Sequence, residues 1–518
     1  MKKIFLQDKE KILLLFIFLF SFFINYFYAN KGVSPHDSFS HFDTGFRILL
    51  GEYPFKDYWI ISGPIIDYIQ GFFFYIFGTN WNAYVLHASF LNCSITIATF
   101  FVLKNFDIGI LQSFLFSIFF SILAYTTSGT PFVDHHATFF SLLGIYCLML
   151  AIKNDNNIYW ICLPIFFILA FLSKQVPSAY IIILSILILI LYSVFQKKFK
   201  WIIPSLVSSM SFIIIIFMIG SIHGIKFSSF YEQYISYPQT IGEERFSNYK
   251  FTLNSIFLHF KYIYLSLFLL SYIFIKKTIK TKNFIKKKDF LYFLILTLFT
   301  ISLIFHQILT KNQTFIFFVI PIILAFCLRK NDFKKLISYS CIFFCLFVTL
   351  KYHLRFNEDR KFHDLSNSNF DLAINAEVID KKLKVIKWIT PGQFNNEPNK
   401  EIQFIKSTKD YLKKEERNYM VITNYSFFSS ILEKKTYSPT RWHTGDGTDF
   451  PRLKNKYFQN YKNMIKNSIK DNQIEVIYII YPIKTSSILN YINKNCFDIS
   501  NINEFLISLK IKKCNELL

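Results

Sequence analysis

Apolar residues come in long blocks along the first 350 residues of the chain, with short polar stretches between them. The first block, residues 12–29 (ILLLFIFLFSFFINYFYA), is long enough to cross about 30 Å of hydrocarbon at about 1.5 Å per helical residue. The blocks predict about eleven membrane-spanning helices. We place them at residues 12–29, 82–103, 109–126, 137–152, 158–173, 177–195, 201–222, 256–275, 289–306, 314–328 and 335–350.

The loops between these blocks predict an orientation. If the N-terminus is cytoplasmic, the inner loops include QKKFK, IKKTIKTKNFIKKK and LRKNDFKK and hold most of the Lys and Arg of the loops. Such an excess is typical of cytoplasmic loops. The loops 30–81 and 223–255 and everything after residue 350 are then expected outside the cytoplasm.

The first outer loop carries an amphipathic pattern of its own. DSFSHFDTGFRILLGEYPF and SGPIIDYIQGFFFYIFG place apolar residues at helical spacing between Gly and Pro residues. The pattern predicts two helices that lie in the membrane interface.

From residue 351 the composition becomes polar. NYMVITNY and IEVIYIIYPI read as buried strands, and three amphipathic stretches between and around them read as helices. We therefore predict a transmembrane domain over 1–350 and an extracytoplasmic α/β domain over 351–518. Cys496 and Cys514 could form a disulfide there.

Composition agrees with a membrane protein. The chain of 518 residues is 53% hydrophobic and 20% aromatic, and only 18% of its residues are charged. The net charge of +23 could indicate nucleic-acid binding. Because the Lys residues gather in the loops between spans, we interpret that charge as a topology signal and expect no nucleic-acid partner.

Several ionisable residues are predicted to share the outer face. Asp37, Arg47 and Asp57 lie in the first loop, Asp134 opens the fourth span, Lys174 lies in the turn after the fifth, and Arg245 follows the seventh. A charge at the hydrocarbon boundary is costly unless it is paired or lines a wet cavity, so these positions indicate a site.

Each of these residues also has a structural interpretation. Asp37 and Asp134 could simply cap helix N-termini. Asp134, His135 and His136 could instead hold a divalent metal ion, although no metal-binding spacing supports this and adjacent His side chains on a helix diverge by about 100°. In the tail, SPTRWHTGDGTDFPR carries Arg441, Trp442, His443, Asp446 and Asp449. It reads either as an ordinary surface loop, which we favour, or as a loop that faces the membrane site.

Four stretches resemble the GT-C superfamily of polytopic glycosyltransferases, in particular its protein-mannosyltransferase and aminoarabinose-transferase branch. They are HDSFSHFDTGFRILLGEYPFKDYWIISGPIIDYIQGFFFYIFG, PFVDHHATFFSLLGIYCLML, ILAFLSKQ and TFIFFVIPIILAFCL. The first three are similar to motifs of that branch in order and spacing. The fourth lacks the Arg that many members carry before the Pro, for which Lys311 or Gln313 could substitute.

The resemblance implies an inverting enzyme that takes a sugar from a polyprenyl phosphate and passes it to a lipid, glycan or protein. By position it implies that Asp37 is the catalytic carboxylate, that Asp134 is an auxiliary acid or a metal ligand, and that Lys174 contacts the lipid phosphate. We expect Arg47, Asp57 and Arg245 to contribute to substrate binding. No cofactor is certain, and a divalent metal is a possibility.

Two other functions compete with this hypothesis. An O-antigen ligase or polymerase would rely on Arg and His in a late outer loop, and a lipid or polysaccharide flippase would place charges near the membrane midplane. The charged residues here fall at the ends of spans. We therefore favour a glycosyltransferase at the outer face of the inner or plasma membrane.

Overall fold

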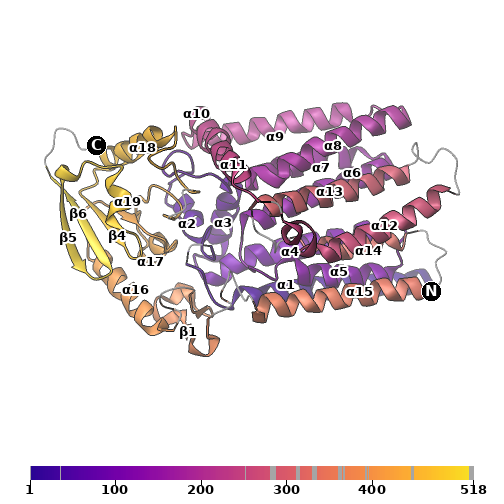
Figure 1. Ribbon diagram of the computed structural model, residues 1–518, viewed down its shortest axis with the longest axis horizontal. Helices are drawn as coiled ribbons and strands as arrows, with labels where there is room; N and C mark the ends of the chain where they lie inside the picture. The colour runs from indigo at the N-terminus through magenta and orange to yellow at the C-terminus, as the bar shows by residue number, and fades with distance from the viewer. Residues whose placement is uncertain are drawn as a thin grey trace.

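The computed structural model describes residues 2–35, 37–250, 252–279, 288–310, 316–329, 335–359, 365, 368–390, 394, 396–444 and 448–512. A bundle of long helices occupies one side, and a smaller part with a β-sheet covers one end of it (Figure 1). The helices of the bundle are α1 (Lys2–Ala29), α4 (Trp81–Asn105), α5 (Ile110–Ala124), α6 (Val133–Asn154), α7 (Asn157–Ser173), α8 (Gln175–Gln196), α9 (Ile202–Ile222), α12 (Lys261–Ile279), α13 (Lys288–Thr310), α14 (Val319–Cys327) and α15 (Lys335–Leu354).

Each of the eleven expected spans overlaps one of these helices, although the bounds differ for α12 and α14. Among the described residues, seven helices are long and apolar enough to cross a membrane, and α5 and α7 are shorter apolar helices. The protein is therefore an integral membrane protein whose described part contains seven candidate spans. Eleven crossings stay a prediction, because α14 has only nine residues.

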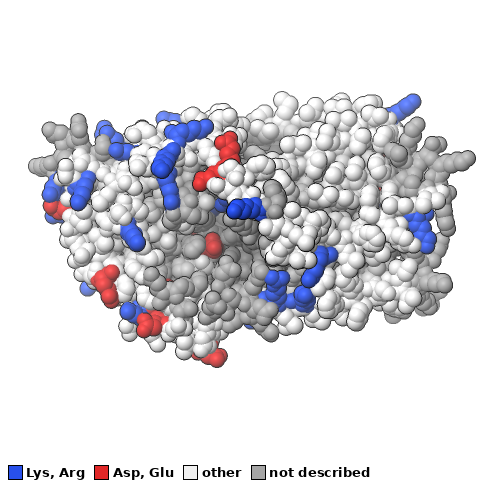
Figure 2. Space-filling model, in the orientation of Figure 1, with Lys and Arg blue, Asp and Glu red and all other residues white. Residues whose placement is uncertain are grey.

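The surface of the bundle agrees with this interpretation. On the face shown in Figure 2, Lys, Arg, Asp and Glu gather over the sheet-containing part, at the end of the bundle next to it and at the opposite end of the molecule. The middle of the bundle carries almost no charged side chains on this face. Helix α9 turns large apolar side chains such as Ile203, Met210 and Phe217 outward, as a helix surrounded by lipid does.

The first outer loop folds into two helices between the bundle and the sheet. They are α2 (Phe42–Leu49) and α3 (Pro64–Phe77), as the amphipathic pattern predicts. Pro64 occupies the first helical position, which suits a residue with no amide hydrogen and a fixed φ. The segment between α9 and α12 contains α10 (Phe227–Phe230), a π-helical turn, Tyr231–Ser236, that leads into α11 (Tyr237–Ser247), and a second π-helical turn, Asn254–Leu258.

The C-terminal part has a four-stranded sheet of order β3-β4-β6-β5. Strands β3 (Tyr419–Ile422) and β4 (Val476–Ile480) are parallel and fully buried, as their apolar sequences predict. Helices α16 (Pro398–Lys413), α17 (Phe428–Leu432), α18 (Phe458–Asp471) and α19 (Thr485–Leu489) accompany the sheet. Helix α18 buries Tyr461, Ile465 and Ile469, which are four residues apart and so share one face.

The sequence analysis missed some of this part. Strands β5 (Phe497–Asn503) and β6 (Leu506–Ile511) form an antiparallel hairpin that the pattern did not reveal, because β5 exposes every residue after Phe497. A short pair, β1 (Ile374–Asn375) and β2 (Lys387–Trp388), was also missed. Cys496 is disulfide-bonded, and Cys514 lies outside the described residues.

Candidate active site

An ion pair with a third partner lies at the end of the bundle nearest the C-terminal part. The ammonium of Lys174 donates to both carboxylate oxygens of Asp134, at 2.9 and 2.8 Å, and His306 Nε2 lies 3.0 Å from Asp134 Oδ1. Asp134 and His306 are buried, and the Lys174 side chain is 19% exposed. The structure thus brings together two of the expected residues and adds a third.

The local sequence explains why these side chains meet. Asp134 lies in the first turn of α6, Lys174 is the extended residue (φ −161°) between α7 and α8, and His306 lies four residues before the end of α13. Pro177 disfavours a helical conformation of Val176, so α8 cannot simply continue α7. Lys174 is therefore held in a short turn from which it reaches Asp134.

Capping does not account for Asp134. The N-cap position of α6 is occupied by Phe132, and the Asp134 carboxylate binds side chains of two other segments instead. An ionised carboxylate at this depth requires such partners, since the desolvation of an unpaired one costs several kcal/mol. Of the three side chains, that of Lys174 is the most exposed to solvent.

The two histidines after Asp134 point elsewhere. His136 Nε2 lies 2.9 Å from His87 Nε2, and its Nδ1 lies 3.0 Å from the carbonyl oxygen of Phe132. His135 stacks on Tyr125 with 4.3 Å between ring centroids. Among the described residues no three His, Cys, Asp or Glu side chains converge as metal ligands. The side chains of Asp134, His135 and His136 therefore do not converge in this structure, and a metal site stays a prediction.

Asp37 lies in a tight turn before α2. Ser38 N donates to Ser34 O, Ser34 N donates to Ser38 Oγ, and Ser40 N donates to the carbonyl of Asp37. Helix α2 begins at Phe42 with His41 as its N-cap residue, so Asp37 does not cap it. The Asp37 side chain is half-buried.

The other expected substrate contacts have different roles. Arg47 is buried, binds Glu52 at 3.0 Å and donates to the carbonyl of Ser438, so it joins the first loop to the C-terminal part. Asp57 accepts a hydrogen bond from Tyr53 N at 2.7 Å, which closes a local turn. Both residues therefore make structural contacts within the protein, and their expected part in substrate binding stays a prediction.

Arg245 lies near the cluster of Asp134, Lys174 and His306. It lies in the last turn of α11, its side chain is exposed, and its charge is close enough to interact with that of His306. Lys311 and Gln313, which could contact a substrate from the late span, lie outside the described residues.

A second buried polar cluster joins the first loop to the tail. Asp67 of α3 accepts hydrogen bonds from His41 Nδ1 (2.7 Å), Thr44 Oγ1 (2.5 Å), Tyr58 OH (3.2 Å) and Arg441 Nη2 (3.2 Å). Burial favours the neutral acid, but Arg441 and His41 outweigh it and hold the pKa of Asp67 below its ordinary value. Burial, together with the charge of Arg441, lowers the pKa of His41 to about 4.

The tail loop that contains Arg441 is not an ordinary surface loop. Trp59 N donates to Pro439 O at 2.8 Å, and Thr440 forms a bridge with Trp59.

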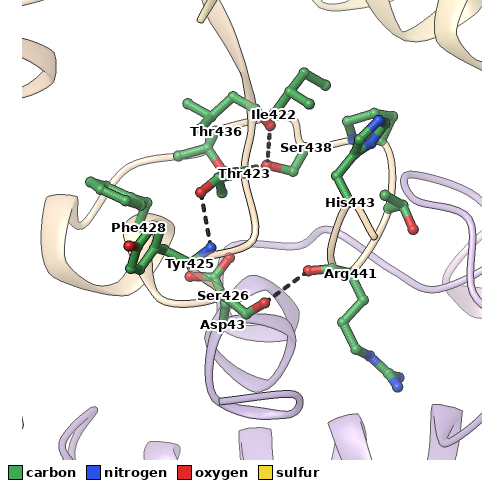
Figure 3. Close-up of a pocket in the computed structure, with 13 residues that line it drawn as sticks. Asp43, Ile422, Thr423, Tyr425, Ser426, Phe428, Thr436, Ser438, Arg441 and His443 are labelled. Atoms are coloured by element: carbon green, nitrogen blue, oxygen red, sulfur yellow. Dashed lines mark hydrogen bonds between the residues drawn. The ribbon is translucent and has the colours of Figure 1, made fainter. Parts of the chain in front are cut away.

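Figure 3 shows the adjoining small pocket, in which Asp43 of α2 lies beside Tyr425 and Ser426 and the Arg441 side chain points away from it. Of the other loop residues, His443 is buried and stacks on Phe450, Asp449 is bound by Thr444, and Trp442 is partly exposed. Asp446 lies outside the described residues.

The sequence analysis gave no role to His306 or His41, and Asp67 counted there only as one of several charges of the first loop. His306 offered a signal, because an ionisable residue inside the apolar stretch LIFHQIL is unusual. His41 and Asp67 lie in the first of the four stretches that resemble the GT-C superfamily, and the spacing between them matches no known motif. The partners of all three residues come from distant parts of the chain.

Comparison with known proteins supports an enzymatic role. Residues 62–220 match the family model described as dolichyl-phosphate-mannose-protein mannosyltransferase, and this segment includes Asp134 and Lys174. No curated protein matches the chain. Since that mannosyltransferase family is part of the GT-C superfamily, the match over residues 62–220 confirms the resemblance to this superfamily and supports glycosyltransferase activity.

Proposed function

We propose that this glycosyltransferase moves a sugar from a polyprenyl-phosphate donor to a lipid, glycan or protein acceptor at the outer face of the inner or plasma membrane. The N-terminus would be cytoplasmic and residues 351–518 would form an extracytoplasmic domain. The observation that carries the proposal is the Asp134–Lys174–His306 cluster, which offers one accessible cation at the end of the bundle.

Lys174 is the proposed contact for the donor phosphate. When the sugar leaves, the phosphodiester becomes a phosphate monoester and gains negative charge. A cation already in place stabilises that charge without reorganisation during the reaction. Asp134 is then an auxiliary residue, because its carboxylate holds the Lys174 ammonium in position.

Asp37 is the proposed general base. Its carboxylate takes the proton of the acceptor hydroxyl while that oxygen bonds to the anomeric carbon and the bond from carbon to phosphate oxygen breaks. Attack from the face opposite the leaving phosphate inverts the anomeric centre. Arg245, near the cluster and exposed, can contribute a second positive charge towards the phosphate.

Release of polyprenyl phosphate tests the proposal directly. The protein in nanodiscs is given a panel of polyprenyl-phosphate sugars and membrane acceptors, and Asp37→Asn and Lys174→Met are compared with wild type. We expect each variant to lose about 100-fold or more of the rate, since general-base catalysis alone contributes about 10²–10⁴. A matched control is Asp155→Asn, which breaks the Asp155–Lys198 pair at another site and should leave the rate unchanged.

Two results would overturn the proposal. Full activity in Asp37→Asn would exclude its role as the base. Movement of the intact donor across the bilayer, with no release of polyprenyl phosphate, would identify a flippase instead.

A further inference from the structure

The first outer loop is tied to the C-terminal part by a buried arginine. Arg441 Nη2 donates to the carbonyl of Ser62 at 2.8 Å and to Asp67 Oδ2 at 3.2 Å. The Arg441 side chain is 4% exposed, so this contact is shielded from salt and water. One residue of the tail thus holds both the backbone before Gly63 and a carboxylate of α3.

Asp67 passes this constraint to the segment that contains Asp37. Its Oδ1 accepts from His41 Nδ1 at 2.7 Å, so the neutral His41 ring carries its proton on Nδ1. Thr44 and Tyr58 occupy the remaining acceptor positions of Asp67. His41 is the N-cap residue of α2 and lies four residues after Asp37, so its position fixes the end of the Asp37 turn.

Gly63 and Tyr84 connect His41 to the segment before Asp134. Gly63 lies against the side chains of both His41 and Val133. A β-carbon on Gly63 would lie 2.6 Å from His41 Cε1 and 2.9 Å from Val133 Cγ1. On the other side, His41 N donates to Tyr84 OH at 3.3 Å, and Tyr84 OH makes a longer contact of 3.5 Å with Pro131 O. The segments before Asp134 and after Asp37 therefore meet at His41 and Tyr84.

We infer that Arg441, Asp67 and Tyr84 are positioning residues that set the segment of Asp37 against that of Asp134, so that the tail helps to assemble the active site. This inference rests on the proposed function, because it assumes that Asp37 and Asp134 belong to the active site. The arrangement explains why a residue of the tail is buried beneath the first loop. His41 Nε2, which has no hydrogen-bond partner among the described residues, is enclosed at the centre of the contact.

The test combines kinetics with hydrogen exchange in the full-length protein. The variants are Arg441→Met and Tyr84→Phe, and the matched control is Ser429→Ala, which removes a different hydrogen bond between the first loop and the tail, from Ser429 Oγ to Asp43. We expect kcat to fall about tenfold or more in both variants with little change in the KM for donor, because small misplacements of reacting groups cost up to about 100-fold. Amide exchange of residues 38–44 should accelerate in both variants and not in the control.

Each other outcome overturns the inference. A kcat equal to that of Ser429→Ala would show that the contact is only structural. A lower kcat without faster exchange in residues 38–44 would show that Arg441 acts directly rather than through the loop. Tyr84→Phe keeps the ring and removes only the hydroxyl, so it decides the question if Arg441→Met does not fold. If wild type transfers no sugar, the proposed function fails, and the exchange measurement still decides whether Arg441 orders the Asp37 segment.

Discussion

The ammonium of Lys174 lies 2.9 Å from Oδ1 and 2.8 Å from Oδ2 of Asp134, forty positions away in the chain. The pair is asymmetric, because the Asp134 side chain is 5% exposed and that of Lys174 is 19% exposed. Loss of one partner therefore has a different consequence from loss of the other.

Lys174→Met should destabilise the protein more than Asp134→Asn. The first change leaves a buried carboxylate with only His306, a situation that typically costs about 3–5 kcal/mol. The second leaves an ammonium that can turn towards water. Thermal unfolding in detergent measures the difference, and Lys198→Met, which breaks a more exposed pair, should cost about 1 kcal/mol or less. Equal losses in the two variants of the cluster would contradict this assignment.

Gly63→Ala should disturb the packing of His41 and Val133 against Gly63. Gly63 has φ +74°, a conformation that costs other residues about 1–2 kcal/mol, and a β-carbon there would overlap both neighbours. Overpacking adds about 1–3 kcal/mol. Gly51→Ala is the matched control, since Gly51 has φ +76° but nothing within 4 Å of an added β-carbon. The prediction is wrong if the two variants lose the same stability.

Stability should fall as the pH is lowered from 6.5 towards 4. Burial lowers the pKa of His443 to about 3 and contributes most to the lowered pKa of His41. Below pH 6.5 the unfolded chain binds protons at both residues while the folded protein does not, so acid favours unfolding. Each residue contributes up to about 1.4 kcal/mol per pH unit in this window.

The His443→Phe variant isolates one of these contributions. His443 stacks on Phe450, and neither ring nitrogen has a hydrogen-bond partner among the described residues, so Phe should fit the site. We expect the apparent melting temperature of the variant to depend less on pH between 7 and 5 than that of wild type. An unchanged slope would show that His443 does not titrate on unfolding.

Glu401→Gln should maintain or raise stability at pH 7.5. Glu401 accepts hydrogen bonds from Trp388, Thr390 and Tyr425, yet burial raises its pKa above the ordinary value. Because the pKa of Glu401 is higher in the folded protein than in the unfolded chain, the folded protein loses stability as the pH rises from the unfolded-state pKa to the folded-state pKa. A neutral Gln retains acceptors for Trp388 and Thr390 without that loss, so its benefit should disappear near pH 4. Melting curves at the two pH values provide the check, and a destabilised variant at pH 7.5 would contradict it.

The apolar blocks determined much of the fold by themselves. All eleven blocks became helices, because a stretch of apolar residues must satisfy its own backbone hydrogen bonds when lipid or a core surrounds it. The alternation of strand-like apolar stretches and amphipathic stretches after residue 351 likewise predicted β3, β4 and α16. The hairpin of β5 and β6 was not predicted, because β5 is an exposed edge strand and its polar sequence resembles that of a loop.

For the candidate site, the sequence indicated Asp134 and Lys174, because they lie at the ends of apolar blocks on the predicted outer face, where a charge is costly unless it is paired or lines a wet cavity. It could not identify their partners. His306 lies 172 positions from Asp134, and Arg441 lies 374 positions from Asp67. Such pairs depend on which helix ends meet in space, and no local periodicity records that. The tertiary structure alone decided that His135 and His136 turn away from Asp134 and that the tail reaches into the first loop.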